Sequence, residues 1–292
     1  MLPSRMQDLV NLCHLDIRGT HRLKEMPKGM GKLKHLNLLG FYIVGEHEEN
    51  GIRELGPIDV HGSFRISKLE NVNNSGEALE AKMGNKKHIH ILELKWSSED
   101  DDVVDVETER DILEELPPHS NLKELSIYGY RGKINIPRLN CRELPPLGQL
   151  PSLQHLQIIG LHGLERIGEE FYKSHEGTSF RSLEELGFYR MYNWREWHIP
   201  DKLDAFPKLK TLRMHNCPVL SGDLSAPFPA LEELQIWNCE VLAYSLLRAP
   251  KLHKIYVTGF KYSMKKAAPH EVRIENTEQV QSVLEYCPVS EV

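Results

Sequence analysis

The sequence predicts an α/β repeat protein, in which short parallel strands stack into a curved sheet and irregular or short helical arcs return the chain. Three segments share the frame L-x-x-φ-x-φ, where φ is apolar: residues 209–214 (LKTLRM), 231–236 (LEELQI) and 252–257 (LHKIYV). Their first residues stand 22 and then 21 positions apart. A frame repeated at roughly this spacing is typical of a leucine-rich-repeat solenoid, with the sheet on its concave face and the arcs on its convex face.

Within each frame, alternate residues of the strand face opposite sides of the sheet. Leu212 and Met214 stand two residues apart and are expected in the core. Thr211, Arg213 and His215 are expected on the solvent side. Every repeat should therefore bury its leucines and display the residues between them.

Residues 1–44 are interpreted as N-terminal repeats. One frame opens at Leu12, and Leu33 opens the next 21 residues later, with Leu36 and Leu38 as further inward positions. The chain thus begins within the repeat pattern, without the polar terminal repeat that normally shields the end of a solenoid. The sequence therefore indicates a fragment or a truncated gene product.

Residues 45–121 are expected to hold irregular repeats. The charged segment from Gly45 to Gly51 is predicted to be a loop, and Phe64 and Ile66 resume the strand frame. A further strand is expected from Ile89 to Leu94. The solenoid should therefore continue beneath the irregular connections.

Two helices and an acidic loop are predicted within this region. Ser75 is expected to cap a helix of strong helix formers at residues 77–83, which Gly84 ends. The segment from Glu99 to Asp111 carries eight carboxylates but lacks the central Gly and closing Glu of a calcium loop. We therefore predict a solvated loop there, followed by a second helix that Thr108 caps.

Residues 122–260 carry the regular repeats, whose frames open at Leu122, Leu153 and Leu183 and at the three segments named first. Residues 261–292 are predicted to form a C-terminal cap, with a strand at 272–274 and then a helix that begins at Thr277. The apolar face of that helix consists of Val280, Val283, Leu284 and Cys287.

Composition excludes several classes of function. The formal net charge is −6, so no basic excess favours nucleic acid or an anionic membrane as a partner. No apolar run approaches the length of a membrane span, and the first residues form no secretion signal. The five cysteines form no C-x-x-C pair, which favours reduced thiols and a cytoplasmic location over a disulfide scaffold.

The sequence carries no motif for catalysis or nucleotide binding. The pairs Gly31-Lys32 and Gly132-Lys133 are followed by Leu33 and Ile134, whereas a phosphate-binding loop needs Ser or Thr after its lysine. No nucleophile elbow or H-E-x-x-H sequence is present. We therefore expect no enzyme activity, no catalytic residue and no cofactor.

Two groups of residues invite a metal-site interpretation that the sequence does not favour. His88 and His90 are positioned as a ligand pair on one strand, but no third ligand is evident, so a structural or surface role is preferred. Cys217 and Cys239 each occupy the ninth position of a repeat, where a small side chain bonds backbone groups inside the turn. We therefore expect no metal site.

The solvent side of the predicted sheet is the candidate binding surface. It mixes aromatic rings with Arg and His, a composition typical of protein-binding hot spots, on the concave face that suits a macromolecular partner. Packing of these side chains on their lateral neighbours is the alternative. The candidate partner-binding residues are Tyr128, His155, Gln157, Glu185, Tyr189, Arg213, His215, Glu233, Gln235, Trp237 and Tyr256. Ile159 is also expected on this side of the sheet.

Several blocks of the sequence, taken together and in order, resemble one protein family. They are residues 2–36 (LPSRMQDLVNLCHLDIRGTHRLKEMPKGMGKLKHL), 66–72 (ISKLENV), 77–83 (EALEAKM) and 144–172 (LPPLGQLPSLQHLQIIGLHGLERIGEEFY), followed by two Asn-Cys turns. Over nearly the whole chain they resemble the repeat region of plant intracellular coiled-coil nucleotide-binding leucine-rich-repeat disease-resistance proteins.

This resemblance implies a module that senses a pathogen effector, directly or through a guarded host protein, and that restrains a nucleotide-binding switch domain. ADP and ATP would bind only in that switch domain, whose phosphate-binding loop has no counterpart in this sequence. The expected partners are therefore an effector, a guarded host protein or the receptor's own nucleotide-binding domain. A generic repeat adaptor such as a ubiquitin-ligase substrate receptor, an extracellular receptor ectodomain and a non-functional truncated product are the alternatives.

Overall fold

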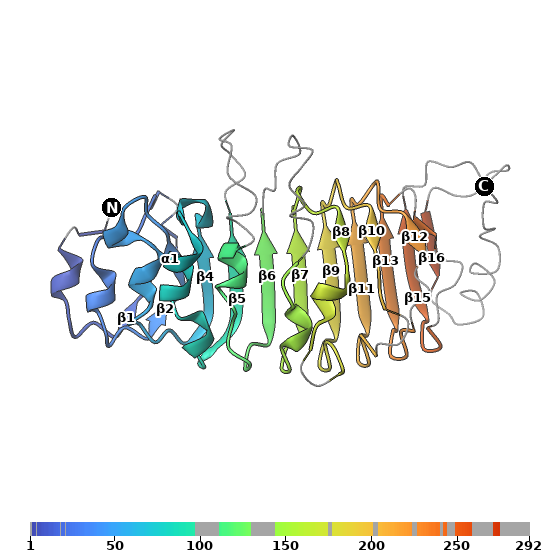
Figure 1. Cartoon of the computed structure of the whole chain (residues 1–292), viewed down its shortest axis with the longest axis horizontal. Helices are drawn as coiled ribbons and strands as arrows, with labels where there is room; N and C mark the ends of the chain where they lie inside the picture. Colours follow the sequence, from blue (N-terminus) through green and yellow to red (C-terminus); the bar gives the residue numbers. More distant parts are fainter. Residues whose placement is uncertain are drawn as a thin grey trace. The chain divides into compact units, whose positions relative to one another are not determined.

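Figure 1 shows the computed structural model of the whole chain. The chain consists of two compact units, Met1–Cys141 and Arg142–Val292, which we call unit 1 and unit 2 and describe separately. The structure describes every residue outside 1, 4, 18, 21, 97–110, 130–143, 175–176, 201–203, 224–226, 240–241, 244–248, 259–270 and 275–292. Among the described residues, no helix has both the length and the apolar character needed to cross a membrane.

Unit 1 is built on parallel strands that follow one another in chain order. β3 (Phe41–Ile43), β4 (Gly62–Ser67), β5 (Ile89–Lys95) and β6 (Glu124–Tyr128) form its main sheet. A separate pair joins β1 (His14–Leu15) to β2 (Leu38–Leu39), also in parallel. Parallel neighbours need a crossover that returns the chain, and each irregular arc between strands supplies one.

Unit 2 repeats the same arrangement with greater regularity. β7 (His155–Ile159), β9 (Glu185–Tyr189), β11 (Thr211–His215), β13 (Glu233–Trp237) and β15 (Lys254–Thr258) are parallel, and β16 (Glu271–Ile274) adds an antiparallel strand beside β15. The second and fourth residues of the five parallel strands are buried. The predicted leucine-rich-repeat fold, with its inward leucines, is therefore confirmed.

The arcs contain short helices and short strand pairs. In unit 2, β8 (Arg166–Ile167) pairs with β10 (Glu196–Trp197), and β12 (Gly222–Asp223) pairs with β14 (Leu242–Ala243), both in parallel. Besides the helical residues 111–114, the described helices are α1 (Ser75–Glu80) and the 3-10 helices η1 (Met6–Asp8), η2 (Met30–Lys32), η3 (Glu48–Asn50), η4 (Ile52–Leu55), η5 (Leu69–Asn71), η6 (Met83–Asn85), η7 (Leu147–Gln149) and η8 (Glu169–Tyr172).

A stack of aromatic rings links the arcs of unit 2. Phe180, Phe206 and Phe228 each stand three residues before the opening leucine of a repeat. The ring centroids of Phe180 and Phe206 are 5.3 Å apart, those of Phe206 and Phe228 are 5.9 Å apart, and all three side chains are buried. Stacked rings bury a large apolar area, so this ladder holds successive repeats together.

β7, β9, β11 and β13 are each followed by a residue in the left-handed conformation. Gly160, Arg190, Asn216 and Asn238 occupy equivalent positions with φ between 54° and 70°. Gly and Asn adopt this conformation readily, whereas Arg does so at a cost. The Asn of each Asn-Cys turn therefore sets the backbone so that the following Cys points inward.

The predicted role of Leu38 is wrong. Its side chain is 47% exposed, while that of Leu39 is buried. A bend at Gly40 separates β2 from β3 and shifts the alternation by one residue, so Leu39 and then Tyr42 face the core. A single-residue shift of this kind exchanges the two faces of a strand.

The predicted helix at residues 77–83 is shorter and begins earlier than expected. Asn74 is its N-cap, because the Asn74 side chain accepts a hydrogen bond of 3.1 Å from the backbone amide of Glu77. Ser75, the predicted cap, is the first helical residue instead. The α-helix ends at Glu80, and residues 83–85 form the 3-10 helix η6 in place of its last turn.

The remaining predictions for unit 1 and the C-terminus have mixed outcomes. The strands at Phe64 and at Ile89–Leu94 are confirmed as β4 and β5, and residues 111–114 are helical. The strand at 272–274 is confirmed as part of β16. Most of the acidic loop, Thr108 and the helix at Thr277 lie outside the described residues.

Candidate functional site

The displayed residues of unit 2 align into three rows across the sheet. We call fourteen of these positions, the first, third and fifth of the parallel strands as far as Tyr256, the strand face. The first row is His155, Glu185, Thr211, Glu233 and Lys254; the second is Gln157, Gly187, Arg213, Gln235 and Tyr256; the third is Ile159, Tyr189, His215 and Trp237. The register thus brings ten of the eleven candidate partner-binding residues onto one face.

Tyr128 is the candidate residue that the structure places in unit 1. It ends β6, where it is half-buried and lies opposite Lys95 of β5. The sheet of unit 1 also carries an ion pair on its solvent side, between Arg65 Nε and Glu93 Oε2 at 2.5 Å. Tyr128 therefore belongs to the displayed side of unit 1 and is treated separately from the strand face.

Aromatic rings run along the third row of the strand face. The ring of Tyr189 meets that of His215 edge-on, with centroids 5.1 Å apart, and His215 stacks on Trp237 with centroids 4.5 Å apart. Trp237 is nevertheless 46% exposed. The rings therefore pack on their lateral neighbours, as the alternative interpretation expects, and Trp237 also remains open to solvent. The binding interpretation of these residues stays a prediction.

His215 lies between the rings of Tyr189 and Trp237. Burial lowers its pKa, the adjacent Arg213 guanidinium lowers it further, and contact with the Gln235 amide partly opposes them. The imidazole is therefore neutral at pH 7 and presents an aromatic plane. Its buried Nε2 has no hydrogen-bond partner within the described part of the chain, which leaves a polar atom to be satisfied.

Charged side chains hold fixed positions beside the aromatic row. Arg213 Nη1 of β11 donates to Glu185 Oε2 of the neighbouring strand β9 at 2.6 Å. His155 Nε2 lies 3.9 Å from the other carboxylate oxygen of Glu185. Lys210 and Glu184 form a similar pair just before these strands, with 2.7 Å between nitrogen and oxygen. The guanidinium and carboxylate are thus oriented before any partner arrives.

Gly187 is a part of the strand face that sequence reasoning missed. A Cβ atom at this position would lie 2.5 Å from Cε2 of Tyr189, so the tyrosine ring rests against the bare backbone. Because Gly187 has no side chain, the Tyr189 ring can lie over its backbone. In the second row, no side chain stands between Gln157 and Arg213. A glycine at a displayed strand position was the available signal in the sequence.

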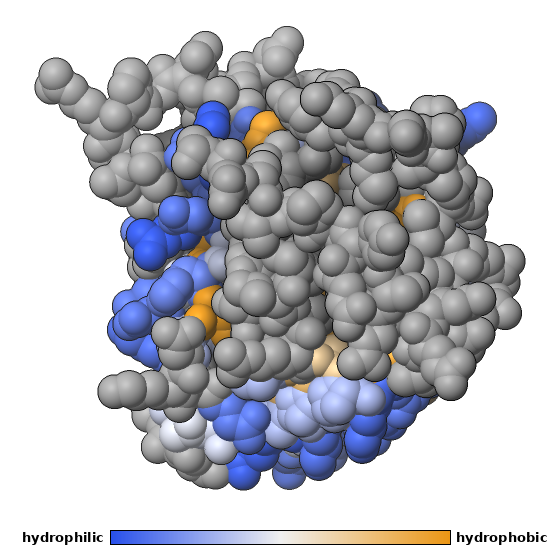
Figure 2. All heavy atoms as spheres, turned by 90° about the vertical axis from the view of Figure 1, so that its right-hand side faces the viewer, coloured by the Kyte–Doolittle hydropathy of each residue, from blue (hydrophilic) through white to orange (hydrophobic). Residues whose placement is uncertain are grey.

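Figure 2 views the molecule from the right-hand side of Figure 1 and colours the described residues by hydropathy. Where residues are described, that view is largely hydrophilic, with apolar residues confined to small separate areas. Tyr192 is also exposed, at 45%, but it lies outside the strand face and stacks on His162 with centroids 5.3 Å apart. It offers a matched aromatic control for the third row.

The cysteines of the two Asn-Cys turns have the predicted structural role. Both are buried and carry free thiols. Cys217 Sγ donates to His215 O at 3.7 Å, and Cys239 Sγ lies 3.4 Å from Met214 O. The thiols thus bond to the backbone inside the turn, as the sequence indicated.

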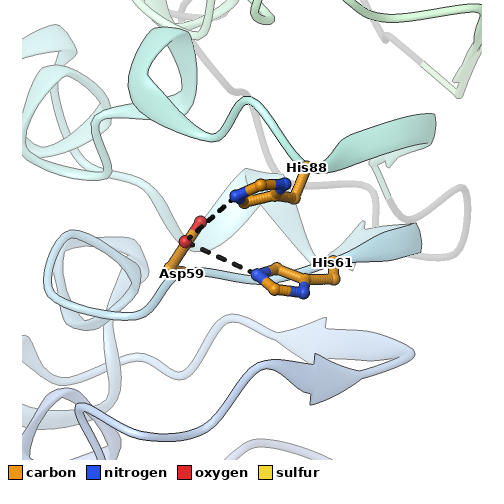
Figure 3. A group of neighbouring side chains, drawn as sticks. All are labelled: Asp59, His61 and His88. Atoms are coloured by element: carbon orange, nitrogen blue, oxygen red, sulfur yellow. Dashed lines mark ion pairs between the residues drawn. The ribbon is translucent and has the colours of Figure 1, made fainter.

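The sequence indicates no third metal-ligand candidate beside His88 and His90, and the structure gives His88 different neighbours. It brings His88 to His61 and Asp59, whereas His90 is exposed and stands outside that group (Figure 3). His61 and Asp59 stand 27 and 29 residues upstream of His88, so only the strand register makes them its neighbours. The structural or surface role expected for His88 stays a prediction.

Comparison with known proteins agrees with this architecture. The family model for R13L1/DRL21 leucine-rich repeats matches residues 52–161. The chain is 34% identical to the disease resistance RPP13-like protein 1 of Arabidopsis thaliana over 215 residues, which are 63% of this chain and 20% of that protein. It is 33% identical to disease resistance protein RGA2 of Solanum bulbocastanum over 214 residues, which are 65% of this chain and 22% of that protein.

The chain therefore spans about a fifth of the length of the curated relatives that it matches. Both relatives are named as disease resistance proteins of plants, and residues 52–161 of this chain match a model of leucine-rich repeats. Residues 52–161 match the R13L1/DRL21 leucine-rich-repeat family, and the chain resembles the repeat region of plant disease resistance proteins.

Proposed function

We propose that the strand face of unit 2 is a non-catalytic protein-recognition surface of a plant intracellular immune receptor. The observation that carries this proposal is the stacked third row, in which Trp237 stays 46% exposed although His215 lies flat against it. Exposed Trp and Tyr rings supply large contact areas at low entropic cost and dominate protein-binding hot spots. The ordered rings of the strand face have that character.

The polar groups around the aromatic row support a protein partner rather than a small ligand. Arg213 and Glu185 present a guanidinium and a carboxylate that a hydrogen bond of 2.6 Å holds in place. An aromatic centre within a polar surround is the arrangement typical of protein interfaces. Stacked repeats extend such a surface over several strands.

The partner in this proposal is a pathogen effector, a guarded host protein or the receptor's own nucleotide-binding domain. Binding of the last would hold the receptor inactive until an effector displaces it. The free thiols of Cys217 and Cys239 suit a reducing compartment such as the cytoplasm, which supports the intracellular location.

Co-precipitation tests the autoinhibitory form of this proposal. The full chain and the remainder of a similar protein, RGA2, are expressed as two polypeptides, and capture of one by the other is measured. We expect the wild-type chain to be captured and a Tyr189→Ala/Trp237→Ala double variant to lose at least tenfold in affinity. The matched control Tyr192→Ala, which removes an exposed ring outside the strand face, should bind like the wild type.

Two results would contradict the proposal in different ways. Equal capture of the double variant and the wild type would show that another surface makes the contact. Failure of the wild-type chain to capture the remainder would exclude autoinhibition through this chain and leave effector or host-protein recognition as the function to test. Circular dichroism of each variant checks that the repeats remain folded.

A further inference from the structure

Three side chains of unit 1 converge on one point at the entrance to β4 and β5 (Figure 3). His61 Nε2 lies 3.5 Å from Asp59 Oδ2, and His88 Nε2 lies 3.8 Å from the same oxygen. The ligand-type atoms of all three residues are within 4.8 Å of one another. The two imidazoles are neighbours as well, with ring centroids 4.3 Å apart.

The backbone explains why these residues meet. Asp59 and His61 stand two residues apart in the segment that leads into β4, so their side chains point to the same side where that segment is extended. Gly62 N donates to His88 O at 2.8 Å, and the strand register pairs Gly62 with Ile89. His61 and His88 therefore hold equivalent places in consecutive repeats.

A buried lysine fixes the two repeats behind this cluster. Lys86 is 3% exposed, and its Nζ donates to Leu55 O at 2.8 Å and to Ile58 O at 2.7 Å. These bonds tie the segment before β5 to the segment before Asp59. The positions of Asp59 and His88 are thus set by buried hydrogen bonds and not only by surface side-chain rotamers.

Ordinary hydrogen bonding does not account for the cluster. Separations of 3.5 and 3.8 Å between the imidazole nitrogens and the carboxylate oxygen exceed the 2.7–3.2 Å of N–H···O bonds. A metal ion with bonds of about 2.0–2.1 Å holds tetrahedral ligands about 3.3 Å apart. The observed separations are close to that value, and small rotations of exposed side chains would reach it.

We propose that Asp59, His61 and His88 bind a divalent transition-metal ion of the zinc class. Two imidazoles and one carboxylate are a ligand set that Zn²⁺ accepts, and hard ions such as Mg²⁺ or Ca²⁺ prefer an all-oxygen set. The three side chains are 57%, 39% and 42% exposed in the order Asp59, His61, His88, so the ion is reached from solvent and water completes its coordination. The site joins one repeat to the next.

The positively charged ammonium of Lys86 disfavours the binding of a second cation at this site. Lys86 interacts with the Asp59 carboxylate through space, so a cation already lies near one ligand. Its hydrogen-bonding capacity is directed to the two carbonyls of Leu55 and Ile58, and Asp59 Oδ2 faces the imidazoles instead. An accessible site with three protein ligands should bind the ion more weakly than a closed structural site with four.

Isothermal titration of the full chain with Zn²⁺ tests the proposal. We expect one saturable site in the wild type and at least a tenfold loss of affinity in each of His61→Ala, His88→Ala and Asp59→Asn. His90→Ala is the matched control, because His90 is an exposed histidine of β5 outside the cluster, and its affinity should equal that of the wild type. A ligand that binds only the folded state stabilises it, so saturating Zn²⁺ should raise the melting temperature of the wild type and of His90→Ala. It should not raise the melting temperature of the three cluster variants.

Each other outcome overturns the inference. No saturable Zn²⁺ binding by the wild type would exclude the site, and equal binding by all variants would assign the zinc to other side chains. Circular dichroism without metal shows whether a variant folds, and His61→Gln and His88→Gln replace any Ala variant that does not. A Gln variant that folds and binds Zn²⁺ like the wild type would likewise contradict the proposal.

Discussion

The indole of Trp237 lies flat on the imidazole of His215, with ring centroids 4.5 Å apart and an angle of 5° between the ring planes. The two residues are direct partners in the register of β11 and β13. Their contact therefore crosses from one repeat to the next on the displayed side of the sheet. It orders a ring that a binding partner would otherwise have to immobilise.

A double-mutant cycle on this pair should give a measurable coupling. Stacked aromatic pairs contribute about 0.5–1.5 kcal/mol beyond their buried area, so Trp237→Ala and His215→Ala should be non-additive by that amount. Urea unfolding of the full chain measures it. The pair Trp237 and Tyr189, which His215 separates, is the control and should be nearly additive; equal coupling in both pairs would argue against a direct stacking contribution.

Gly187→Ala should displace Tyr189 without unfolding the protein. The new Cβ would lie 2.5 Å from Cε2 of the tyrosine, but the ring can swing away, so we expect a loss of less than about 1 kcal/mol in the free energy of unfolding. The edge-on contact between Tyr189 and His215 should disappear from aromatic NOE spectra. An unchanged NOE would mean that the glycine does not determine the ring position.

Phe206→Ala should be among the most damaging single changes in unit 2. Phe206 is buried between Phe180 and Phe228, and removing a buried phenyl ring typically costs about 3–5 kcal/mol. Tyr192→Ala removes a ring that is 45% exposed and should cost less than about 1 kcal/mol. Thermal unfolding compares the two; similar melting temperatures would show that the stack does not hold the repeats together.

Stability should rise with pH through the titration of Lys86. Burial lowers its pKa from 10.5 to about 8, while Asp59 opposes this shift. Between these two values the unfolded chain still carries a proton that the folded chain has released, so the free energy of unfolding increases with pH there. Below pH 8 the folded state carries the full cost of the buried charge.

Lys86→Met isolates that effect from other titrating groups. It leaves Leu55 O and Ile58 O without their donor, which costs about 1–3 kcal/mol for each unsatisfied carbonyl, but it removes the pH-dependent term. The stability difference between wild type and variant should therefore grow from pH 7.5 to pH 10. A constant difference across this interval would show that the pKa of Lys86 is not lowered by folding.

The left-handed turns predict opposite effects of two substitutions on the free energy of unfolding. Arg190 has φ 57°, so Arg190→Gly should stabilise the protein by about 1 kcal/mol, and Asn216→Val should destabilise it by about 1–2 kcal/mol. Asn216 also accepts a hydrogen bond of 3.0 Å from Asn238, which the valine cannot replace. Chemical denaturation measures both changes; a loss of stability in Arg190→Gly would contradict the conformational argument.

The strand pattern could be predicted because it depends on neighbours in the sequence. The alternation that buries Leu212 and Met214 and displays Arg213 follows from the geometry of any strand. Equal repeat spacing then places the same positions side by side, so most of the strand face could be named before its geometry was known. The exception at Leu38 arises from the bend at Gly40, where the spacing rule fails.

The details that sequence reasoning missed depend on residues far apart in the chain or on competing local signals. Asn74 and Ser75 are both good helix caps, and the sequence alone does not rank them. His61 and His88 meet only because Gly62 pairs with Ile89. The resting place of Tyr189 on Gly187 likewise depends on a side-chain rotamer, which the alternation of the strand does not determine.

Because buried apolar side chains alternate with displayed ones along β7, β9, β11, β13 and β15, a substitution on the strand face leaves the buried positions of its repeat unchanged. Under the proposed function, evolution can therefore exchange the side chains at the fourteen outer positions while the scaffold below stays intact, and single codon changes suffice to alter which partner is bound. Exchanging those positions between two relatives should then transfer the binding preference of one to the other.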